Sequence, residues 1–321
     1  MEKGIKIMYS KEKHQDILDN LHTIRDYIRW TISEMSTEKA YFGHGSDSIW
    51  DEAVHLVLSA INMSHEIDSN MVDAKLLTAE KEIIINYVYQ RACERKPLPY
   101  ILKKAWFADM EFDIDERVII PRSPIAELIH NGYSPWVNDV YDVSNVLDLC
   151  TGSGCIGIAS SQVFENADVT LVDISDVAIE VANHNISKHK LNDRVKAVKS
   201  DLFANLGDKK FGVIVSNPPY VDSDDLVNMP SEYHFEPKLA LESGKDGLDL
   251  TKRIILKADK HLTEDGVLIV EVGNSQYALM DMCPDIPFTW LSFTEGGDGV
   301  FLLTYAELVK YKEHFKNYFA V

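Results

Sequence analysis

The sequence predicts a doubly wound α/β domain that follows a helical N-terminal domain. From about residue 145 onward, short apolar runs alternate with helical segments, a pattern typical of a parallel sheet covered on both faces. Between residues 10 and 100, apolar residues instead recur near the period of a helix. The length of 321 residues fits about two domains of ordinary size.

Three helical segments are predicted in the N-terminal part. In residues 14–35, isoleucines and leucines fall on one helical face. Residues 50–62 and 78–95 are predicted to form two further helices, and Thr78 is the predicted N-cap of the second of them. The stretch 95–100 then breaks the helical pattern at Pro97 and Pro99.

A β-hairpin is predicted at 105–120, where apolar and polar residues alternate and aromatics are frequent. The sequence therefore divides into a helical domain at 1–103, a hairpin linker at 104–124 and an α/β domain at 125–321. The apolar runs predict five parallel strands, followed by an antiparallel pair around a glycine-rich turn at the sheet edge. These runs are 145–150, 168–174, 194–201, 211–217 and 266–272, and the final pair is 289–295 and 299–305.

A glycine-rich loop connects the first of these strands with a helix. Gly152 and Gly154 permit tight turns and the close approach of a ligand, and the N–H groups of the helix start would face a negative group. Together with Gly157 they match the G-x-G-x-x-G dinucleotide fingerprint. Taken alone, this match also fits a tight strand-to-helix turn in any α/β protein.

Two carboxylates follow at the ends of the next two strands. Asp173 could accept both hydroxyls of a ribose, a feature that NAD-binding and S-adenosylmethionine-binding sheets share. Asp201 could reach an adenine amino group, with Leu202 or Phe203 packed on the ring. Each carboxylate could instead act only as a cap of a helix or strand. Their positions at the carboxyl ends of consecutive strands predict one shared crevice.

The motif Asn217-Pro218-Pro219-Tyr220 ends the fourth strand beside this crevice. An amide nitrogen is a poor nucleophile because its lone pair is delocalised. The Asn217 side-chain carbonyl and the Pro218 backbone carbonyl could accept hydrogen bonds from both N–H groups of a planar amide or amine. Tyr220 offers a flat face to the same group. The nitrogen could then face a sulfonium methyl, with catalysis by positioning and preorganised dipoles.

These motifs, in this order, resemble those of the HemK-type N5-glutamine protein methyltransferases. They are residues 148–154, 172–175, 200–203 and 216–221. The resemblance spans residue 118 to the end. It implies a Rossmann-like class I methyltransferase sheet, with S-adenosyl-L-methionine as the methyl donor and the side-chain amide of a glutamine as the acceptor.

Two further stretches, 41–58 and 104–129, resemble the branch of this family that acts on large-subunit ribosomal protein L three. The release-factor branch generally has an acidic residue and a threonine after Pro-Arg-Pro. Residues 121–128, which read PRSPIAEL, depart from that pattern. The resemblance thus implies ribosomal protein L three as the substrate, recognised by the helical domain, and leaves release-factor methylation as an alternative.

The resemblance also implies roles for individual residues. The glutamine amide would be held by Asn217, Pro218, Pro219 and Tyr220. The donor would be surrounded by Cys150, Thr151, Gly152, Ser153, Gly154, Asp173, Ile174, Asp201, Leu202 and Asn217. Cys150 stands where the family usually has the first glycine of the loop, so its side chain would narrow the donor site.

The formal net charge of −19, from 32 basic and 51 acidic residues, repels phosphate backbones and attracts cationic partners. It weighs against stable nucleic-acid binding, and so against an enzyme that methylates a flipped-out adenine, which the Asn-Pro-Pro-Tyr motif would otherwise permit. An NAD-dependent dehydrogenase fits the glycine spacing but leaves that motif unexplained. A non-catalytic ribosome-assembly factor with the same fold is the third alternative.

The remaining features predict little chemistry. No apolar window of membrane-spanning length and no secretory signal is apparent, which predicts a cytoplasmic protein. The four cysteines form no C-x-x-C pair, so no metal site is predicted. Arg122 could either contact the cofactor or substrate or be a surface residue in a proline turn. Glu271 is predicted to have a structural role only. The glutamates of the loop 232–241 are predicted to be solvated. No pattern indicates an oligomeric state.

Overall fold

The structure is a computed structural model that describes residues 9–319, apart from residues 47, 65 and 66. The chain divides into two compact units. The first contains the chain up to Lys104 together with Pro230–Phe235, and the second contains Ala105–Met229 together with the chain from Glu236 onward. The functional division predicted from the sequence, with residues 104–124 as a linker, stays a prediction.

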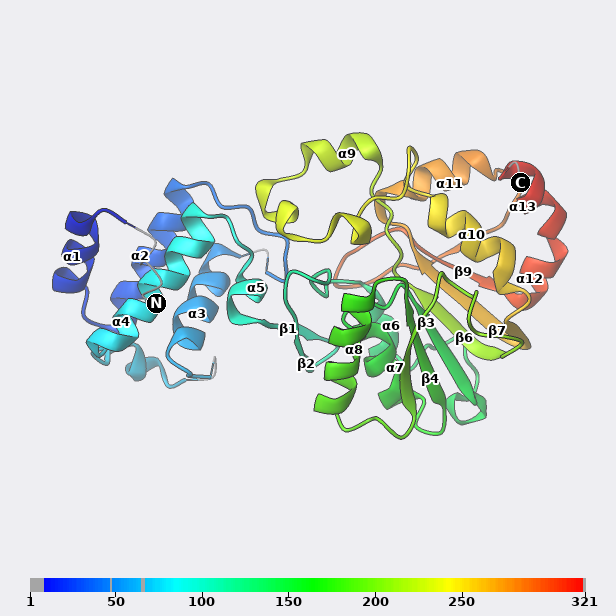
Figure 1. The fold of residues 1–321 in the computed structure, drawn as a ribbon, viewed down its shortest axis with the longest axis horizontal. Coiled ribbons are helices and arrows are strands. Elements are labelled where there is room, and N and C mark those ends of the chain that lie inside the picture. The colour runs from blue at the N-terminus through cyan, green and yellow to red at the C-terminus, as the bar shows by residue number, and fades with distance from the viewer. Residues whose placement is uncertain (1–8, 47, 65–66, 320–321) are drawn as a thin grey trace. The chain divides into compact units, whose positions relative to one another are not determined.

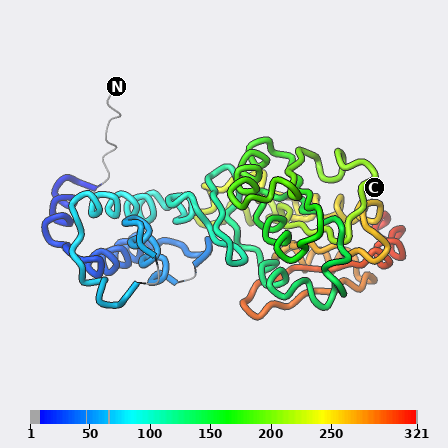
Figure 2. The backbone as a smooth tube through the Cα atoms, turned by 90° about the horizontal axis from the view of Figure 1, so that it is seen from below, coloured from blue at the N-terminus to red at the C-terminus, as the bar shows by residue number. Residues whose placement is uncertain are grey.

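The first unit is helical, and its helices α2, α3 and α4 pack side by side (Figure 1 and Figure 2). Tyr27, Leu56 and Ile84 are fully buried in its core. The elements of this unit are α1 (Lys11–Asn20), α2 (Ile24–Thr37), α3 (Ile49–Ala60), η1 (Ser69–Asp73), α4 (Thr78–Val88), η2 (Tyr89–Cys93), α5 (Leu98–Leu102) and η4 (Ser231–Phe235).

Two sequence predictions for this unit are wrong, one in the interior of a predicted helix and one at a helix start. Residues 14–35 do not form one helix, because a capping box starts α2 anew: the Asp26 N–H donates to the Thr23 hydroxyl, and the Thr23 N–H donates to the Asp26 carboxylate. Thr78 is the first residue of α4 and not its N-cap. The Glu80 carboxylate accepts the backbone N–H of Leu77 at 2.7 Å, which makes Leu77 the cap.

The segment Pro230–Phe235 is held in the first unit by buried charges. The Glu232 side chain is fully buried, and it accepts the Tyr41 backbone N–H at 2.7 Å. The Arg91 guanidinium lies 3.3 Å from a Glu232 oxygen, and the Arg95 guanidinium lies 2.9 Å from the same oxygen. A buried carboxylate needs such partners, because an unpaired charge in the interior is costly.

The second unit begins with a two-stranded sheet, β1 (Lys104–Phe107) and β2 (Met110–Asp113). The predicted hairpin is confirmed for these strands, while residues 114–120 are not part of a strand. A seven-stranded sheet follows, in the order β5-β4-β3-β6-β7-β9-β8. Its strands are β3 (Asn145–Leu149), β4 (Asp168–Asp173), β5 (Val195–Lys199), β6 (Phe211–Ser216), β7 (Leu262–Glu271), β8 (Thr289–Trp290) and β9 (Val300–Thr304).

This sheet has the predicted doubly wound topology. Strands β5, β4, β3, β6 and β7 run parallel, and β9 pairs antiparallel with both β7 and β8. The chain starts in the middle, at β3, and builds outward first to β4 and β5 and then to β6 and β7. The order therefore reverses between β3 and β6, and ligands of open α/β sheets bind at the carboxyl ends of strands at such a point.

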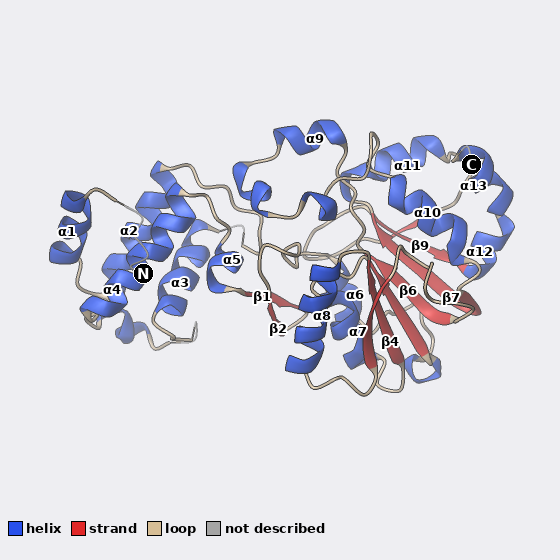
Figure 3. Ribbon diagram, in the orientation of Figure 1, coloured by secondary structure: helices blue, strands red, loops and turns tan. Residues whose placement is uncertain are grey.

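Helices cover both faces of the sheet (Figure 3). Helices α7 and α8 pack on β3, β4 and β5, whereas α10 and α12 pack on β7. Leu147, Ile214 and Leu268 of the sheet share one buried cluster with Ile254 and Phe315 of the C-terminal helices. The remaining helices of this unit are α6 (Ile125–His130), η3 (Val140–Asp142), α7 (Cys155–Val163), α8 (Asp176–Lys188), α9 (Ser223–Asn228), η5 (Lys238–Ala240), α10 (Asp249–Ala258), η6 (Gly273–Ser275), α11 (Gln276–Met282), α12 (Tyr305–Lys310) and α13 (Lys312–Tyr318).

Gly157 allows α7 to lie directly on the sheet. A Cβ atom at this position would come within 2.1 Å of a Leu171 methyl group and 3.0 Å of the Asp148 Cβ. We expect Gly157→Ala to lower the free energy of unfolding by ~1–3 kcal/mol, because the added methyl group overpacks this contact. Denaturant unfolding measures the change. In a Leu171→Val background the same substitution should cost less, and a loss that is equal in both backgrounds would contradict the proposed clash.

Candidate active site

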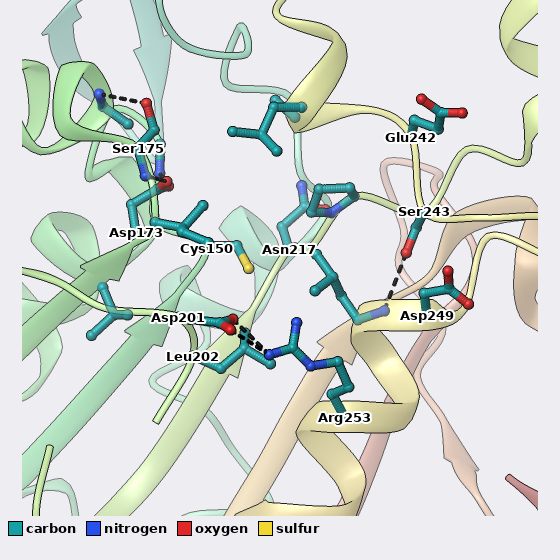
Figure 4. A pocket seen from close by; sticks show the side chains of 18 of the residues that line it. Cys150, Asp173, Ser175, Asp201, Leu202, Asn217, Glu242, Ser243, Asp249 and Arg253 are labelled. Carbon is teal, nitrogen blue, oxygen red and sulfur yellow. Dashed lines mark hydrogen bonds and ion pairs between the residues drawn. The ribbon is translucent and has the colours of Figure 1, made fainter. Parts of the chain in front are cut away.

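A cavity of about 710 Å³ lies at the carboxyl ends of the parallel strands (Figure 4). Its volume is in the range of small-molecule sites. Residues that follow four different strands reach its wall, as the crevice prediction requires. The sequence-predicted site residues that line the cavity are Cys150, Gly152, Asp173, Ile174, Asp201, Leu202, Asn217 and Pro219. Thr151, Ser153, Gly154, Pro218 and Tyr220 were predicted to bind ligands but are not part of its wall as the described residues form it.

In the loop after β3, every second residue from 150 to 154 has a left-handed backbone conformation. The φ angles are 59° at Cys150, 54° at Gly152 and 84° at Gly154. The Asp148 carboxylate supports the loop from the protein interior, because it accepts the Thr151 hydroxyl at 2.5 Å and the Gly157 N–H at 2.9 Å. Complete burial raises the pKa of Asp148 to about 7. Because its hydroxyl donates to this buried carboxylate, Thr151 stabilises the conformation of the loop.

Asp173 joins this loop to the end of β4. One of its carboxylate oxygens accepts the Gly152 N–H at 3.0 Å, and the other accepts the Ser175 N–H at 2.9 Å. Burial raises the pKa of Asp173, while these backbone donors act in the opposite direction. Each carboxylate oxygen has a second lone pair, so the group that fixes the loop can also accept hydroxyl groups of a ligand in the cavity.

Asp201 forms an ion pair that the sequence did not indicate. Both of its carboxylate oxygens lie 2.7 Å from one nitrogen of Arg253, which is in α10. The side chains are 48% and 42% exposed, and both residues line the cavity (Figure 4). Of the two apolar neighbours considered from the sequence, Leu202 lines the cavity, while the Phe203 ring stacks on the His261 ring with centroids 4.6 Å apart.

Asn217 follows β6 directly and lines the same cavity. The residue before it, Ser216, donates its hydroxyl to the Leu149 carbonyl at 2.8 Å and so ties the ends of β6 and β3 together. Within the part of the chain that the structure describes, no protein group forms a hydrogen bond with the Asn217 side chain. Its amide is therefore available to a group in the cavity.

The neighbouring residues of the motif are held more tightly. Pro218 is buried, and Tyr220 is half-buried. The Tyr220 hydroxyl donates to the Glu271 carboxylate at 3.0 Å, and its backbone carbonyl accepts the Ser275 hydroxyl at 2.9 Å. Glu271 thus contacts a residue of the motif, which the sequence analysis did not foresee.

The predicted solvation of the glutamates in 232–241 is wrong. Glu232 and Glu236 are both buried. Glu236 pairs with Arg122, at 2.8 Å between Oε2 and one guanidinium nitrogen, and also accepts the Ile120 N–H at 3.0 Å. The pair compensates the burial of the Glu236 charge. Arg122 therefore fixes the start of the segment after Glu236, of which Pro237, Leu239, Ala240, Glu242, Ser243 and Gly244 line the cavity.

We expect Glu236→Ala to weaken the binding of S-adenosylmethionine, the donor that the resemblance implies, by about tenfold, because the loss of the ion pair releases this part of the cavity wall. Isothermal titration calorimetry measures the affinity. Glu313→Ala is the matched control, since it removes a glutamate from an exposed ion pair with Lys316 outside the cavity wall and should leave the affinity unchanged. Equal affinities of Glu236→Ala and the unmodified protein would contradict the anchoring role.

Other kinds of site are not indicated. No cluster of three or more His, Cys, Asp or Glu side chains suited to a metal ion occurs among the residues described. The four cysteines are free, and burial raises the pKa of the Cys150 thiol well above its ordinary range. None of the helices described has the length and apolar character needed to span a bilayer.

Comparisons with known proteins give the family. Residues 137–231 match the family model of the methyltransferase small domain. A ribosomal protein uL3 glutamine methyltransferase of Francisella tularensis subsp. tularensis is 77% identical over 312 residues, which cover 97% of this chain and 99% of the relative. The protein of the same description from Neisseria gonorrhoeae is 45% identical over 290 residues, covering 90% and 96%.

Among solved structures, the ribosomal protein L11 methylase of Lactobacillus delbrueckii subsp. bulgaricus is similar at 21% identity and a TM-score of 0.40, covering 60% of this chain and 85% of its own. The two uL3 glutamine methyltransferases match this chain over nearly its full length. Their identity and coverage show that this chain belongs to the family of ribosomal protein uL3 glutamine methyltransferases.

Proposed function

We propose that this protein methylates the side-chain amide of a glutamine in ribosomal protein uL3, with S-adenosyl-L-methionine as the methyl donor. The observation that carries the proposal is the placement of Asn217, whose amide has no protein partner among the described residues, on the wall of a cavity that the glycine loop and two strand-end carboxylates also line. The relatives that match nearly the full chain are named for this activity.

The residues around the cavity fit the donor. The left-handed backbone at Gly152 brings the loop close to the cavity, where a ligand can approach main-chain atoms. Asp173 offers carboxylate lone pairs to ribose hydroxyls, and Leu202 offers an apolar surface to an adenine ring. When bound, S-adenosylmethionine supplies an electrophilic methyl group on a sulfonium.

The acceptor would be held by the motif at the end of β6. The Asn217 side-chain oxygen and the Pro218 carbonyl accept the two N–H groups of the glutamine amide, while the Tyr220 ring lies along its plane. With both hydrogens bound, the nitrogen presents its lone pair in one direction. This arrangement needs no general base of altered pKa, and the protein contributes position and fixed dipoles.

The negative charge of this protein also supports uL3 as its substrate. The formal net charge of −19 attracts a basic ribosomal protein and disfavours nucleic acid. The helical first unit, residues 1–103 in the sequence-based division, is part of this proposal as the element that docks the protein substrate. Its exposed aromatic side chains Tyr41 and Trp50 offer apolar contact area.

Mass spectrometry tests the proposal directly. Purified uL3 is incubated with the enzyme and S-adenosylmethionine, and peptides are searched for one added methyl group on a glutamine nitrogen. The same assay includes a release factor, DNA and RNA in parallel, each with enzyme omitted as the blank. We expect a single methylated glutamine in uL3 alone. A methyl group that appears on nucleic acid or the release factor in preference to uL3 would overturn the proposed function.

A further inference from the structure

The segment that follows β7 forms a close-fitting support for Tyr220. The Glu271 carboxylate accepts the Tyr220 hydroxyl at 3.0 Å, and the Ser275 hydroxyl donates to the Tyr220 carbonyl at 2.9 Å. Between these two contacts lies Gly273, with a φ of 47°. A Cβ atom there would come within 2.6 Å of a Tyr220 ring carbon, so the ring lies directly against the backbone at Gly273. One short segment thus fixes the ring, the hydroxyl and the main chain of a single residue.

Burial of the Glu271 carboxylate carries a cost in folding stability, which suggests a role beyond packing. It is 5% exposed, and burial raises its pKa. The Ser123 hydroxyl donates to its second oxygen at 2.5 Å, so each carboxylate oxygen accepts one hydroxyl. Arg122 adds a favourable charge interaction. A buried carboxylate costs stability unless it is fully hydrogen-bonded, and an apolar residue would fill the same space without that cost.

We propose that Glu271 is a positioning residue for methyl transfer, which acts by holding the Tyr220 hydroxyl and so fixing the rotation of the ring on which the acceptor amide lies. This inference rests on the proposed function. If the Tyr220 ring could rotate freely, the plane of the acceptor amide could tilt away from the methyl donor. Misplacement of a reacting group by about 1 Å can cost on the order of 100-fold in rate. In this proposal the Tyr220 hydroxyl takes no part in bond making or breaking, and it contributes to the rate through its hydrogen bond with Glu271.

The test is a double-mutant cycle between Glu271 and Tyr220, read as kcat and KM for uL3 methylation. Glu271→Ala and Tyr220→Phe should each lower kcat by about tenfold. The KM for uL3 and the calorimetric affinity for S-adenosylmethionine should each change by less than about twofold. In the Tyr220→Phe background, Glu271→Ala should cost nothing more in kcat, because the contact through which it acts is already absent. Glu271→Gln, which keeps an acceptor oxygen for the phenol, should recover part of the activity lost in Glu271→Ala.

Tyr133→Phe is the matched control. Its hydroxyl is also buried, in a hydrogen bond of 2.6 Å with Ser160, and lies in the same unit. Removing it should lower the melting temperature without lowering kcat. Losses in kcat that add in the double variant, or a kcat unchanged in Glu271→Ala, would overturn the positioning role. If Glu271→Ala fails to fold, Glu271→Gln with and without Tyr220→Phe completes the cycle. Absence of uL3 methylation by the unmodified enzyme would instead contradict the proposed function.

Discussion

Replacing Asn217 with alanine is expected to lower kcat for uL3 methylation by about 100- to 1,000-fold, the cost of removing one preorganised polar group at a reacting centre. The substitution removes the side-chain oxygen that we propose to accept an N–H group of the acceptor amide. The affinity for S-adenosylmethionine should change much less, because the glycine loop and Asp173 remain in place. Single-turnover methylation and calorimetry give the two quantities separately.

The control for Asn217→Ala is Asn192→Ala, which removes an exposed asparagine that bonds Ser187 at 3.2 Å at the surface. It should leave both the rate and the affinity unchanged. Undiminished turnover of Asn217→Ala would refute the proposed amide contact. A loss of cofactor affinity as large as the loss in rate would show that Asn217 belongs to the donor site alone.

Replacing Asp173 with alanine is expected to weaken the binding of S-adenosylmethionine by about 10- to 100-fold. Hydrogen bonds to charged groups are worth ~1.5–3 kcal/mol, and tenfold in affinity corresponds to about 1.4 kcal/mol. The carboxylate fixes the loop by accepting the Gly152 N–H, and in the proposed complex it would also accept the ligand's hydroxyl groups. Calorimetry with S-adenosylmethionine measures the change.

Asp168→Ala provides a control on the same strand. Asp168 is the first residue of β4 and is exposed, whereas Asp173 is the last and lies at the cavity. Both substitutions remove one negative charge, so an effect of net charge alone would appear in both. An unchanged affinity in Asp173→Ala would exclude this carboxylate from the donor site.

Features of the structure that depend on a local sequence pattern could be predicted from the sequence. Strands that are buried on both faces read as continuous apolar runs, and a polar residue directly after such a run marks the carboxyl end of a strand. For that reason Asp173, Asp201 and Asn217 could be placed in one crevice before the structure was known, and all three line the cavity. The fold class followed from the same alternation and is confirmed by the strand order.

The pairs that complete the site could not be predicted, because their members are far apart in the sequence. Arg253 meets Asp201 only because α10 packs beside the carboxyl ends of the strands. Glu271 meets Tyr220 across the pairing of β6 with β7. The burial of Glu232 and Glu236 also has no local signal, since a glutamate in a polar loop ordinarily indicates a solvated side chain. The start of α2, by contrast, has a local signal in Thr23 and Asp26, which lie three residues apart as a capping box requires.

The placement of Pro230–Phe235 affects how the protein can be dissected. The polypeptide passes from one unit to the other three times, so no single cut releases either unit intact. A fragment that begins near residue 105 would retain Glu232 and lose both arginines that neutralise it, leaving an orphan carboxylate and a short peptide without its fold. The helical part is therefore no detachable module. A gene fusion or a domain exchange at residue 105 would separate Glu232 from Arg91 and Arg95. We therefore expect the two units to be exchanged between proteins only together.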